Sequence, residues 1–449
     1  MSNADAHDGA MAPASGPAAA PWPQLRARRG ADRETVRANQ RERLHAAMIE
    51  AVAERGYTGL TTRRLRALAG VSEKTIYAHF PTKEDYFLST YDRVVREAMG
   101  RIQTAYRAEG NGGQDWQGGL CRAFEAFASE IVERPRQSRL ALLDALAAGP
   151  VAQARIESAE AVFAQMIAQS FAQAPDEVAM PHSLLRSLVG GIWFVTRSRL
   201  LRDRPSTIAD SGRELLDWML TYRDPAVETL PRQGPVPRPY HRDRYRRSER
   251  DERTGLLRAV AELAAQGELP SLTSLKITRQ AGLESAAFSR HFESVADCFL
   301  ASLELMSIEA VARARQESKD AGDWASALCR SVRAVLCQIG EDPVLARAAF
   351  IAVYSAEPSR DRRRANLMRS FAALLGQRAP DGSRPSALVS EAIVGSVWSI
   401  AYRYVVHDRA FVLPSLWPKM SYLTLAPIVG AEAALETITS ELALSARTR

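Results

Sequence analysis

The sequence is poor in cysteine, and its four cysteines form no pattern that binds a metal ion or a redox cofactor. Cys121, Cys298, Cys329 and Cys337 include no Cys-x-x-Cys pair, and no histidine stands at metal-ligand spacing from them. We therefore expect buried free thiols in a reducing cytoplasm, with no metal, disulfide or cofactor.

Signatures of catalytic sites are absent as well. The seven histidines are scattered, and the sequence has no His-Glu-x-x-His motif, no Gly-rich phosphate loop and no nucleophile elbow. The sequence therefore predicts a protein that is not an enzyme. An enzyme built on a helical bundle stays open as an alternative class, and it would need a titratable cluster in a pocket.

Long apolar runs are also missing. None approaches the roughly 18 residues of a membrane-spanning helix. Residues 1–23 carry Asp5 and Asp8 and are interrupted by prolines, unlike a signal peptide. The expectation is a cytoplasmic protein with no membrane partner.

The residues that are abundant favour helices. Ala and Leu dominate a hydrophobic content of 46%, and the alternating Val, Ile and Thr typical of strands are scarce. At 449 residues the chain exceeds the roughly 100–200 residues of one domain, so an all-α fold with several cores is expected. The net charge of +7 favours a polyanionic partner.

Residues 61–80 predict two short helices joined by a tight turn. Thr61 is a suitable N-cap for the first helix, and Gly70 suits the left-handed conformation at its end. Ser72 can cap the second helix, on which Ile76 is expected to pack inward. This is the pattern of a helix-turn-helix, whose second helix enters the major groove of DNA. The outward side chains on that helix are Lys74, Thr75, Tyr77 and His79.

Basic residues precede this motif, and a further helix follows it. Seven arginines lie between residues 26 and 43, and the last three stand at the head of a helix that Gly56 ends. These arginines either form a solvated helix start or contact DNA phosphates. Cations at a helix N-terminus oppose the helix dipole, which favours phosphate contacts. After the motif, Thr82 and Asp85 can form a capping box, beside which Lys83 and free helix N–H groups could bind a backbone phosphate. The arginines are Arg26, Arg28, Arg29, Arg33, Arg37, Arg41 and Arg43.

Composition divides the rest of the chain. Residues 1–30 hold few large apolar groups and are expected to be disordered. Five prolines between Pro225 and Pro239 exclude a packed element and predict a linker over 225–247. The expected domains are a DNA-binding domain over 37–98, a helical effector and dimerisation domain over 99–224, a second helix-turn-helix domain over 248–310 and a second helical domain over 311–445.

The second half of the chain repeats the first. His79-Phe80 recurs as His291-Phe292 at a spacing of 212 residues, which also relates Leu60-Thr61 to Leu272-Thr273 and Ala69-Gly70 to Ala281-Gly282. Matched Trp, Cys and Gly continue the series at 208 and then 205 residues, as between Trp116 and Trp324 and between Trp193 and Trp398. Chance does not account for rare residues kept in one order, so two copies of one two-domain unit are predicted.

The second helix-turn-helix, expected near 273–292, has fewer candidate contacts. Thr75, Tyr77 and Lys83 become Ala287, Ser289 and Val295 at the same spacing. The second copy is therefore either a weaker DNA reader or a scaffold. Its remaining candidates for DNA contact are Ser274, Lys276, Ser285, Arg290 and His291.

The first copy resembles the TetR family of bacterial transcriptional regulators. The resemblance spans about residues 37–98 and rests on Gly56-Tyr57, Leu60-Thr61-Thr62, Ala69-Gly70-Val71-Ser72, Thr75-Ile76-Tyr77-Ala78-His79-Phe80 and Lys83-Glu84-Asp85. It implies a three-helix head, a connecting helix and a larger domain for effector binding and dimerisation. It also implies that Lys74 and Thr75 approach bases while Thr62, Tyr77, His79 and Lys83 hold phosphates. Arg63 and Ser72 complete the candidate DNA-binding set.

A ligand-responsive repressor, nucleoid-associated and bound to a double-stranded DNA operator, is therefore predicted. Family members pair through their last two helices, so helices near 182–201 and 209–223 are expected to pack against those near 386–407 and 420–442. This would make an intramolecular pseudo-dimer, with an ordinary homodimer as the alternative. Trp116, Phe124, Phe127 and Trp193 either line a pocket for a small apolar or aromatic effector or belong to the core. A third class is an effector-binding or partner-binding protein whose heads no longer read DNA.

Overall fold

The computed structural model describes residues 33–108, 116–173, 180–202, 208, 211–222, 225–232, 251–351 and 385–447. Every regular element within these residues is a helix and none is a strand, which confirms the predicted all-α class. The segment 1–30, expected to be disordered, lies outside the described residues.

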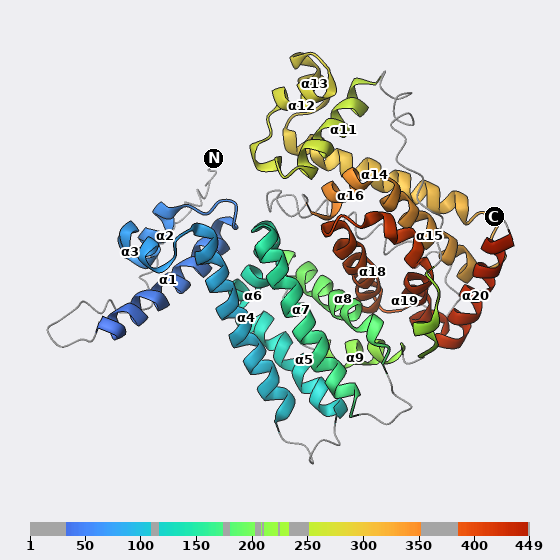
Figure 1. The fold of residues 1–449 in the computed structure, drawn as a ribbon, viewed down its shortest axis with the longest axis horizontal. Helices are drawn as coiled ribbons and strands as arrows, with labels where there is room; N and C mark the ends of the chain where they lie inside the picture. The colour runs from blue at the N-terminus through green and yellow to red at the C-terminus, as the bar shows by residue number, and fades with distance from the viewer. Residues whose placement is uncertain are drawn as a thin grey trace, which may run out of the picture.

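The first head, residues 33–98, consists of three helices and the start of a fourth, drawn in blue (Figure 1). Leu44 and Met48 of the first helix meet Leu65 and Ile76 in its core. Helices of seven or eight residues are too short to be stable alone, so this core supports them. The four helices are α1 (Arg33–Arg55), α2 (Thr62–Ala69), α3 (Glu73–His79) and α4 (Lys83–Arg107).

The caps predicted for the first head are present. The hydroxyl oxygens of Thr61, Ser72 and Thr82 accept hydrogen bonds from backbone N–H groups at 3.3, 3.1 and 3.0 Å and so begin α2, α3 and α4. Gly70 ends α2 with φ 59° and ψ 38°, a left-handed conformation that is costly for a residue with a Cβ atom. Local sequence therefore determines where these three helices start and where α2 stops.

A larger helical bundle follows α4. Pro135 and Pro150 stand at the first turns of two of its helices, where a proline loses no helical hydrogen bond. Its elements are α5 (Trp116–Glu133), α6 (Pro135–Leu142), η1 (Asp144–Ala147), α7 (Pro150–Phe171), α8 (His182–Leu201) and α9 (Gly212–Leu220).

The segment expected to begin a linker is packed at its start. Pro225–Thr229 forms the short helix η4, with Val227 fully buried and Leu230 nearly so. A turn of 3-10 helix accepts proline at its first position, so the proline density does not prevent packing there. Residues 233–250 lie outside the described residues.

In the second half, α11 to α16 follow in the order of α1 to α6, with the short helix η5 added; residues 352–384, between α16 and α18, lie outside the described residues. We call residues 251–310 the second head; it lies at the top of Figure 1, in yellow-green and yellow. The predicted helix near 420–442 is in fact two helices, because Gly430 interrupts it with a positive φ of 88°. The elements are α11 (Glu252–Ala265), η5 (Leu269–Ser271), α12 (Ser274–Ala281), α13 (Ser285–His291), α14 (Val295–Glu317), α15 (Trp324–Glu341), α16 (Pro343–Phe350), α18 (Ala387–Val406), η8 (Ala410–Leu416), α19 (Trp417–Val429) and α20 (Ala431–Arg447).

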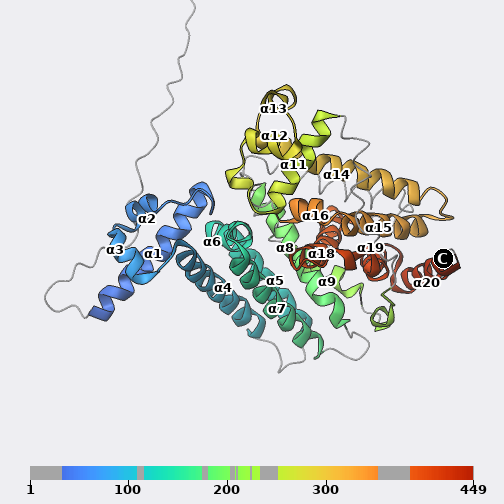
Figure 2. The same cartoon turned by 45° about the horizontal axis from the view of Figure 1, so that its top comes forward.

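Helices α8 and α18 join the two halves and lie side by side in both views (Figures 1 and 2). A Cβ atom at Gly190 of α8 would overlap Ser399 of α18, and one at Gly395 of α18 would lie 2.7 Å from Cγ of Phe194. Glycine is therefore required on both helices for this close approach. Around the crossing, Arg199 pairs with Glu391 at 2.6 Å.

Candidate nucleic-acid interface

The exposed face of α3 carries the main candidate contacts. Lys74 and Tyr77 are exposed, and 46% of the Tyr77 surface is accessible although the residue is large and aromatic. Ile76 and Phe80 point the other way and are buried. A buried apolar face opposite a tyrosine and a lysine leaves α3 free to present polar groups to a groove of DNA.

Thr75 and Ser72 belong both to the helix cap and to the candidate set. Their hydroxyl oxygens lie 2.8 Å apart, and the hydroxyl of Ser72 also accepts the Thr75 N–H. A hydroxyl has one donor and two acceptor sites, so Thr75 keeps capacity for another hydrogen bond. The hydroxyl of Ser72 holds the start of α3, which makes a positioning role the main one for that residue.

His79 departs from the sequence expectation. It was expected to face outward, but its side chain is half-buried and Nε2 lies 3.2 Å from Oε1 of Gln40 in α1. Burial, together with the nearby charges of Arg37 and Arg41, lowers the pKa of the imidazole. A neutral ring bonded to α1 fixes α3 against the first helix, so a phosphate-holding role is not favoured.

The start of α4 lies next in the chain after α3 and keeps an exposed cation. Lys83 is the first residue of this helix, and its Nζ stands 5.1 Å from the ring centre of Tyr57. A lysine over an aromatic face is held by cation–π attraction while its ammonium stays accessible. Together with the N–H groups of the first turn it can meet a phosphate.

The first turn of α2 adds polar and basic groups. Arg63 is exposed and Thr62 is half-buried. The next arginine is different, because Arg64 donates to Glu54 of α1, with Nε 2.8 Å from Oε2. Arg63 is therefore the better candidate for a phosphate contact.

Arg43 supports the turn of the helix-turn-helix, a role that its sequence position did not predict. Grouped with arginines expected to meet phosphate, it is instead buried and donates to the carbonyl oxygens of Ala69 and Gly70, the latter at 2.9 Å. These carbonyls end α2, where helical partners are lacking. Arg43 thus fixes the turn between α2 and α3, while Arg37 and Arg41 remain exposed.

In the second head the candidate cations are paired. Glu252, the first residue of α11, accepts from Arg290 at 2.7 Å and lies 3.2 Å from Nε2 of His291. Lys276 pairs with Glu268 at 2.8 Å. Three of the five candidate residues therefore already pair with carboxylates. The contacts of Arg290 and His291 also lower the pKa of Glu252.

The two serines of the second head remain exposed at helix starts. Ser274 follows Thr273, which caps α12, and Ser285 follows Glu284, which makes no side-chain cap for α13. The carboxylate of Glu284 stands where the first head has the neutral hydroxyl of Ser72. A negative charge at this place opposes an approaching phosphate.

The helix-turn-helix surfaces of the two heads differ in charge. Residues 61–83 contain five basic side chains and one acidic side chain, whereas the equivalent residues 273–295 contain three and two. Phosphate contacts supply much of the affinity of a DNA-binding protein. The first head is the stronger candidate on this ground.

The aromatic residues proposed as pocket walls divide into two groups. Phe127 and Trp193 line a cavity of about 110 Å³ among α4 to α8. Trp116 packs on Phe171 with ring centres 5.2 Å apart, and Phe124 lies against Gly212, so both are parts of the core.

In the described part of the chain, no cluster of three or more His, Cys, Asp or Glu is placed to hold a metal ion. None of the described helices is long and apolar enough to cross a membrane.

Comparison with known proteins bears on the first head. Residues 44–90 match the family model of bacterial regulatory proteins, tetR family. The match begins within α1, includes α2 and α3 and ends within α4, which are the elements that carry the exposed contacts. No curated protein matches the chain.

Two solved structures show slight likenesses. The transcriptional regulator FadR from Bacillus subtilis, in complex with stearoyl-CoA, is 15% identical, with a TM-score of 0.36 over 40% of this chain and 97% of its own. A TetR family transcription regulator from Marinobacter aquaeolei VT8 is 21% identical, with a TM-score of 0.32 over 40% of this chain and 94% of its own.

Proposed function

We propose that the chain is a sequence-specific DNA-binding transcriptional regulator that reads its operator with α3 of the first head. The observation that carries this is the exposed Lys74 and Tyr77 on a helix fixed by caps and by Arg43, within the segment that matches the tetR family model. Such a function places the protein on the nucleoid, in the cytoplasm.

The candidate contacts fall into two groups, those that can reach base edges and those that can reach backbone phosphates. Lys74 and Thr75 lie in the first turn of α3, the part of a recognition helix that meets base edges. Arg63, Tyr77 and Lys83 lie at the rim and suit backbone phosphates, which position a protein without reading sequence. Thr62, half-buried in the first turn of α2, joins this second group.

We infer that the chain is a tandem of two related units. Helix α15 has the bounds of α5 displaced by 208 residues, and α16 repeats α6 at the same displacement. Helix α18 repeats α8 at 205 residues, and α12 and α13 repeat α2 and α3 at 212. Constant displacement of both helix ends, together with the matched rare residues, supports a duplication.

We also propose that the two units form a pseudo-dimer within one chain. At the displacement of 205 residues, Gly190 corresponds to Gly395 and Phe194 to Ser399. The contact of Gly190 with Ser399 is therefore the counterpart of the contact of Gly395 with Phe194. Reciprocal contacts of this kind define an isologous interface, which supports a twofold-like arrangement of the units.

The second head is proposed as a weak reader or a scaffold. Its pairing of Arg290, His291 and Lys276 with carboxylates supports this. The regulator would then act as a repressor that reads one half-site strongly. An apolar effector, if it displaces the heads, would release DNA through a coupling of roughly 1–3 kcal/mol.

DNA binding by the full chain tests the proposal. Fluorescence anisotropy with the gene's own upstream region should give specific binding that falls steeply as salt rises. Tyr77→Ala should weaken binding about tenfold, from the loss of a contact worth about 1.4 kcal/mol. The matched control is Ser289→Ala, the equivalent position of the second head, which should change little.

Two results would contradict the proposal. Absence of salt-dependent binding to any DNA by a folded chain would favour an effector-binding or partner-binding protein. Equal losses from Tyr77→Ala and Ser289→Ala would remove the distinction between the heads. Mapping of genomic binding sites would then supply the operator sequence and the regulated genes.

A further inference from the structure

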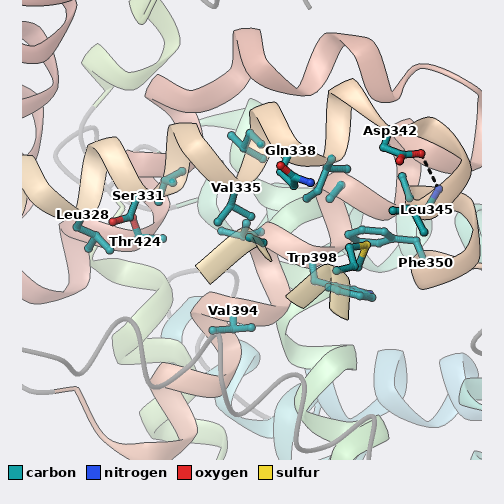
Figure 3. Close-up of a pocket in the computed structure, with 18 residues that line it drawn as sticks. Leu328, Ser331, Val335, Gln338, Asp342, Leu345, Phe350, Val394, Trp398 and Thr424 are labelled. Atoms are coloured by element: carbon teal, nitrogen blue, oxygen red, sulfur yellow. Dashed lines mark hydrogen bonds between the residues drawn. The ribbon is translucent and has the colours of Figure 1, made fainter. Parts of the chain in front are cut away.

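The second bundle contains a cavity of about 110 Å³ lined by residues of α14, α15, α16, α18 and α19. Figure 3 shows Val335 near its middle, Leu328 at one end, and Phe350 with Trp398 toward the other. The rings of Phe350 and Trp398 are stacked, with centres 3.9 Å apart and planes 24° from parallel. They form a flat aromatic wall.

The described lining of this cavity is almost wholly apolar and includes no basic side chain. Ser331 and Thr424, toward one end, use their hydroxyls on backbone carbonyls at 3.5 and 2.8 Å. The donor sites of both hydroxyls are therefore in use, and the side-chain oxygen of Gln338 accepts from Arg313 at 3.2 Å. Figure 3 places Asp342 toward the other end. An apolar cavity of comparable size, about 150 Å³, is known to stay dry and to bind benzene.

Two buried polar atoms of the lining residues meet no hydrogen-bond partner among the described residues. They are Oδ2 of Asp342 and Nε1 of Trp398. Oδ1 of Asp342 is used, since it accepts the Leu345 N–H at 3.1 Å and caps α16. Buried polar atoms without partners cost free energy, so each such atom calls for an explanation. Burial also raises the pKa of the Asp342 carboxyl, which disfavours a charge here.

The equivalent cavity of the first bundle differs in chemistry. At the displacement of 208 residues, Glu130, Arg134 and Phe127 correspond to Gln338, Asp342 and Val335. Glu130 accepts from Arg101 at 2.7 Å and from Arg134 at 3.0 Å, so an ionic group borders the first cavity. Both cavities measure about 110 Å³, but the aromatic wall differs, because Phe127 becomes Val335 and Leu142 becomes Phe350. The second cavity lacks the ion pair of Glu130 and Arg134 at its border.

We propose that the cavity of the second unit binds a compact, uncharged aromatic or apolar molecule carrying one hydroxyl group. The molecule stacks or packs against the wall of Phe350 and Trp398, and its hydroxyl bonds to Oδ2 of Asp342 or Nε1 of Trp398. We expect anions to bind weakly, because none of the described lining residues is a cation that could balance a buried charge. The cavity of the first unit does not take this ligand.

The site lies next to the junction between the units. Val394 and Trp398 line the cavity from α18, the helix that packs against α8 of the first unit. A ligand in the second unit therefore touches α18, the helix that packs against the unit whose head is proposed to read DNA. This role as a sensor rests on the proposed function, whereas binding of the ligand does not.

Isothermal titration of the full chain with phenol, benzene and benzoate at pH 7 tests the inference. Phenol is uncharged at this pH, because phenolic hydroxyls titrate near pH 10. We expect phenol to bind, benzene to bind about threefold to tenfold more weakly, and benzoate to bind at least tenfold more weakly than phenol. Asp342→Asn keeps a capping side chain and should reduce the preference for phenol over benzene.

Matched variants locate the site. Val335→Phe introduces the residue of the first unit and should weaken phenol binding at least tenfold, as should Ala401→Leu if the first variant fails to fold. The converse change, Phe127→Val, should leave phenol binding unchanged. Circular dichroism confirms folding of each variant.

The inference is overturned if benzoate binds as tightly as phenol, or if folded Val335→Phe and Ala401→Leu both retain phenol. Loss of phenol binding in Phe127→Val would move the site to the first unit and would also overturn it. Because titration needs no DNA, its failure leaves the proposed function intact. Failure of DNA binding with phenol still bound would contradict the proposed function alone.

Discussion

His45 couples the recognition unit to the helix behind it. It is buried in α1, with Nδ1 2.9 Å from the hydroxyl oxygen of Thr90 in α4, and its ring meets that of Phe80 edge-on. Burial, aided by the charge of Arg93, lowers the pKa of the imidazole to about 4. The neutral ring is therefore part of the native packing, and protonation opposes it.

The stability of the first head should fall as the pH is lowered from about 6.5 to about 4. In this window the unfolded state binds a proton at His45 and the native state does not. The free energy of unfolding then decreases by up to about 1.4 kcal/mol per pH unit from this group. His45→Leu, which introduces the residue of the second head at this place, Leu257, should remove that part of the dependence.

Denaturant unfolding of both proteins at pH 7.5, 6 and 5 measures the effect. Other groups titrate alike in the two proteins, so the stability of the variant relative to the parent should rise as the pH falls. A difference that stays constant with pH would show that His45 does not carry this linkage.

At the scale of elements, the two helix-turn-helix units share their folding signals and differ in their surfaces. Thr273 caps α12 by accepting the Lys276 N–H at 3.2 Å, and Gly282 ends it with φ 69°, as Thr61 and Gly70 do for α2. In the second unit Arg290 and His291 pair with Glu252, and Lys276 pairs with Glu268, on neighbouring elements. A motif can therefore fold correctly and still present a neutralised face.

Releasing these cations should strengthen DNA binding by the second head. Glu252→Gln frees Arg290 and His291, and the slope of log affinity against log salt should steepen by about one for each new phosphate contact. Competition with non-specific duplex in fluorescence anisotropy measures this slope. The matched control is Glu34→Gln, an exposed acidic residue in the first turn of α1. An unchanged slope in Glu252→Gln would mean that the second head does not face DNA.

Local signals and long-range contacts account for what the sequence could and could not reveal. Caps, glycine stops and repeated rare residues lie within a few positions of the elements they define, so α2, α3 and the second set of helices could be predicted. The roles of Arg43 and His79 could not, because their partners lie 27 and 39 residues away. The same holds for Glu252 with Arg290, 38 residues apart. The break at Gly430 could not be predicted either, because apolar residues continue on both sides of it.

At the scale of the whole molecule, the contact of α8 with α18 joins the two halves of the chain. Ion pairs around this contact link the two halves. His407 lies 3.1 Å from Glu157, and Arg403 lies 3.8 Å from Glu160. The hydroxyl of Tyr222 also donates to the carbonyl of Leu423 at 2.8 Å. A chain that satisfies its own pairing surface has little need of a second copy.

Light scattering should therefore give a mass near 49.4 kDa in solution. Gly395→Val places methyl groups against Phe194 and should force the helices apart, lowering the melting temperature and exposing the interface. Ser440→Val, on the exposed side of α20, serves as the control. A strict dimer of the parent chain would contradict the pseudo-dimer.

Footprinting of the operator should show one half-site protected more strongly than the other, because the two heads differ in their exposed cations. An equally protected palindrome would contradict this difference between the heads.

The reciprocal glycine contacts have a consequence for how such a protein can change. In a homodimer every substitution at the axis is made twice, so a bulky side chain that fits on one side must also fit on the other. Here Gly190 faces a serine and Gly395 faces a phenylalanine, and each pairing can be altered alone. In the proposed pseudo-dimer, the covalent link thus allows the halves to acquire separate tasks by single mutations, without first separating two identical genes.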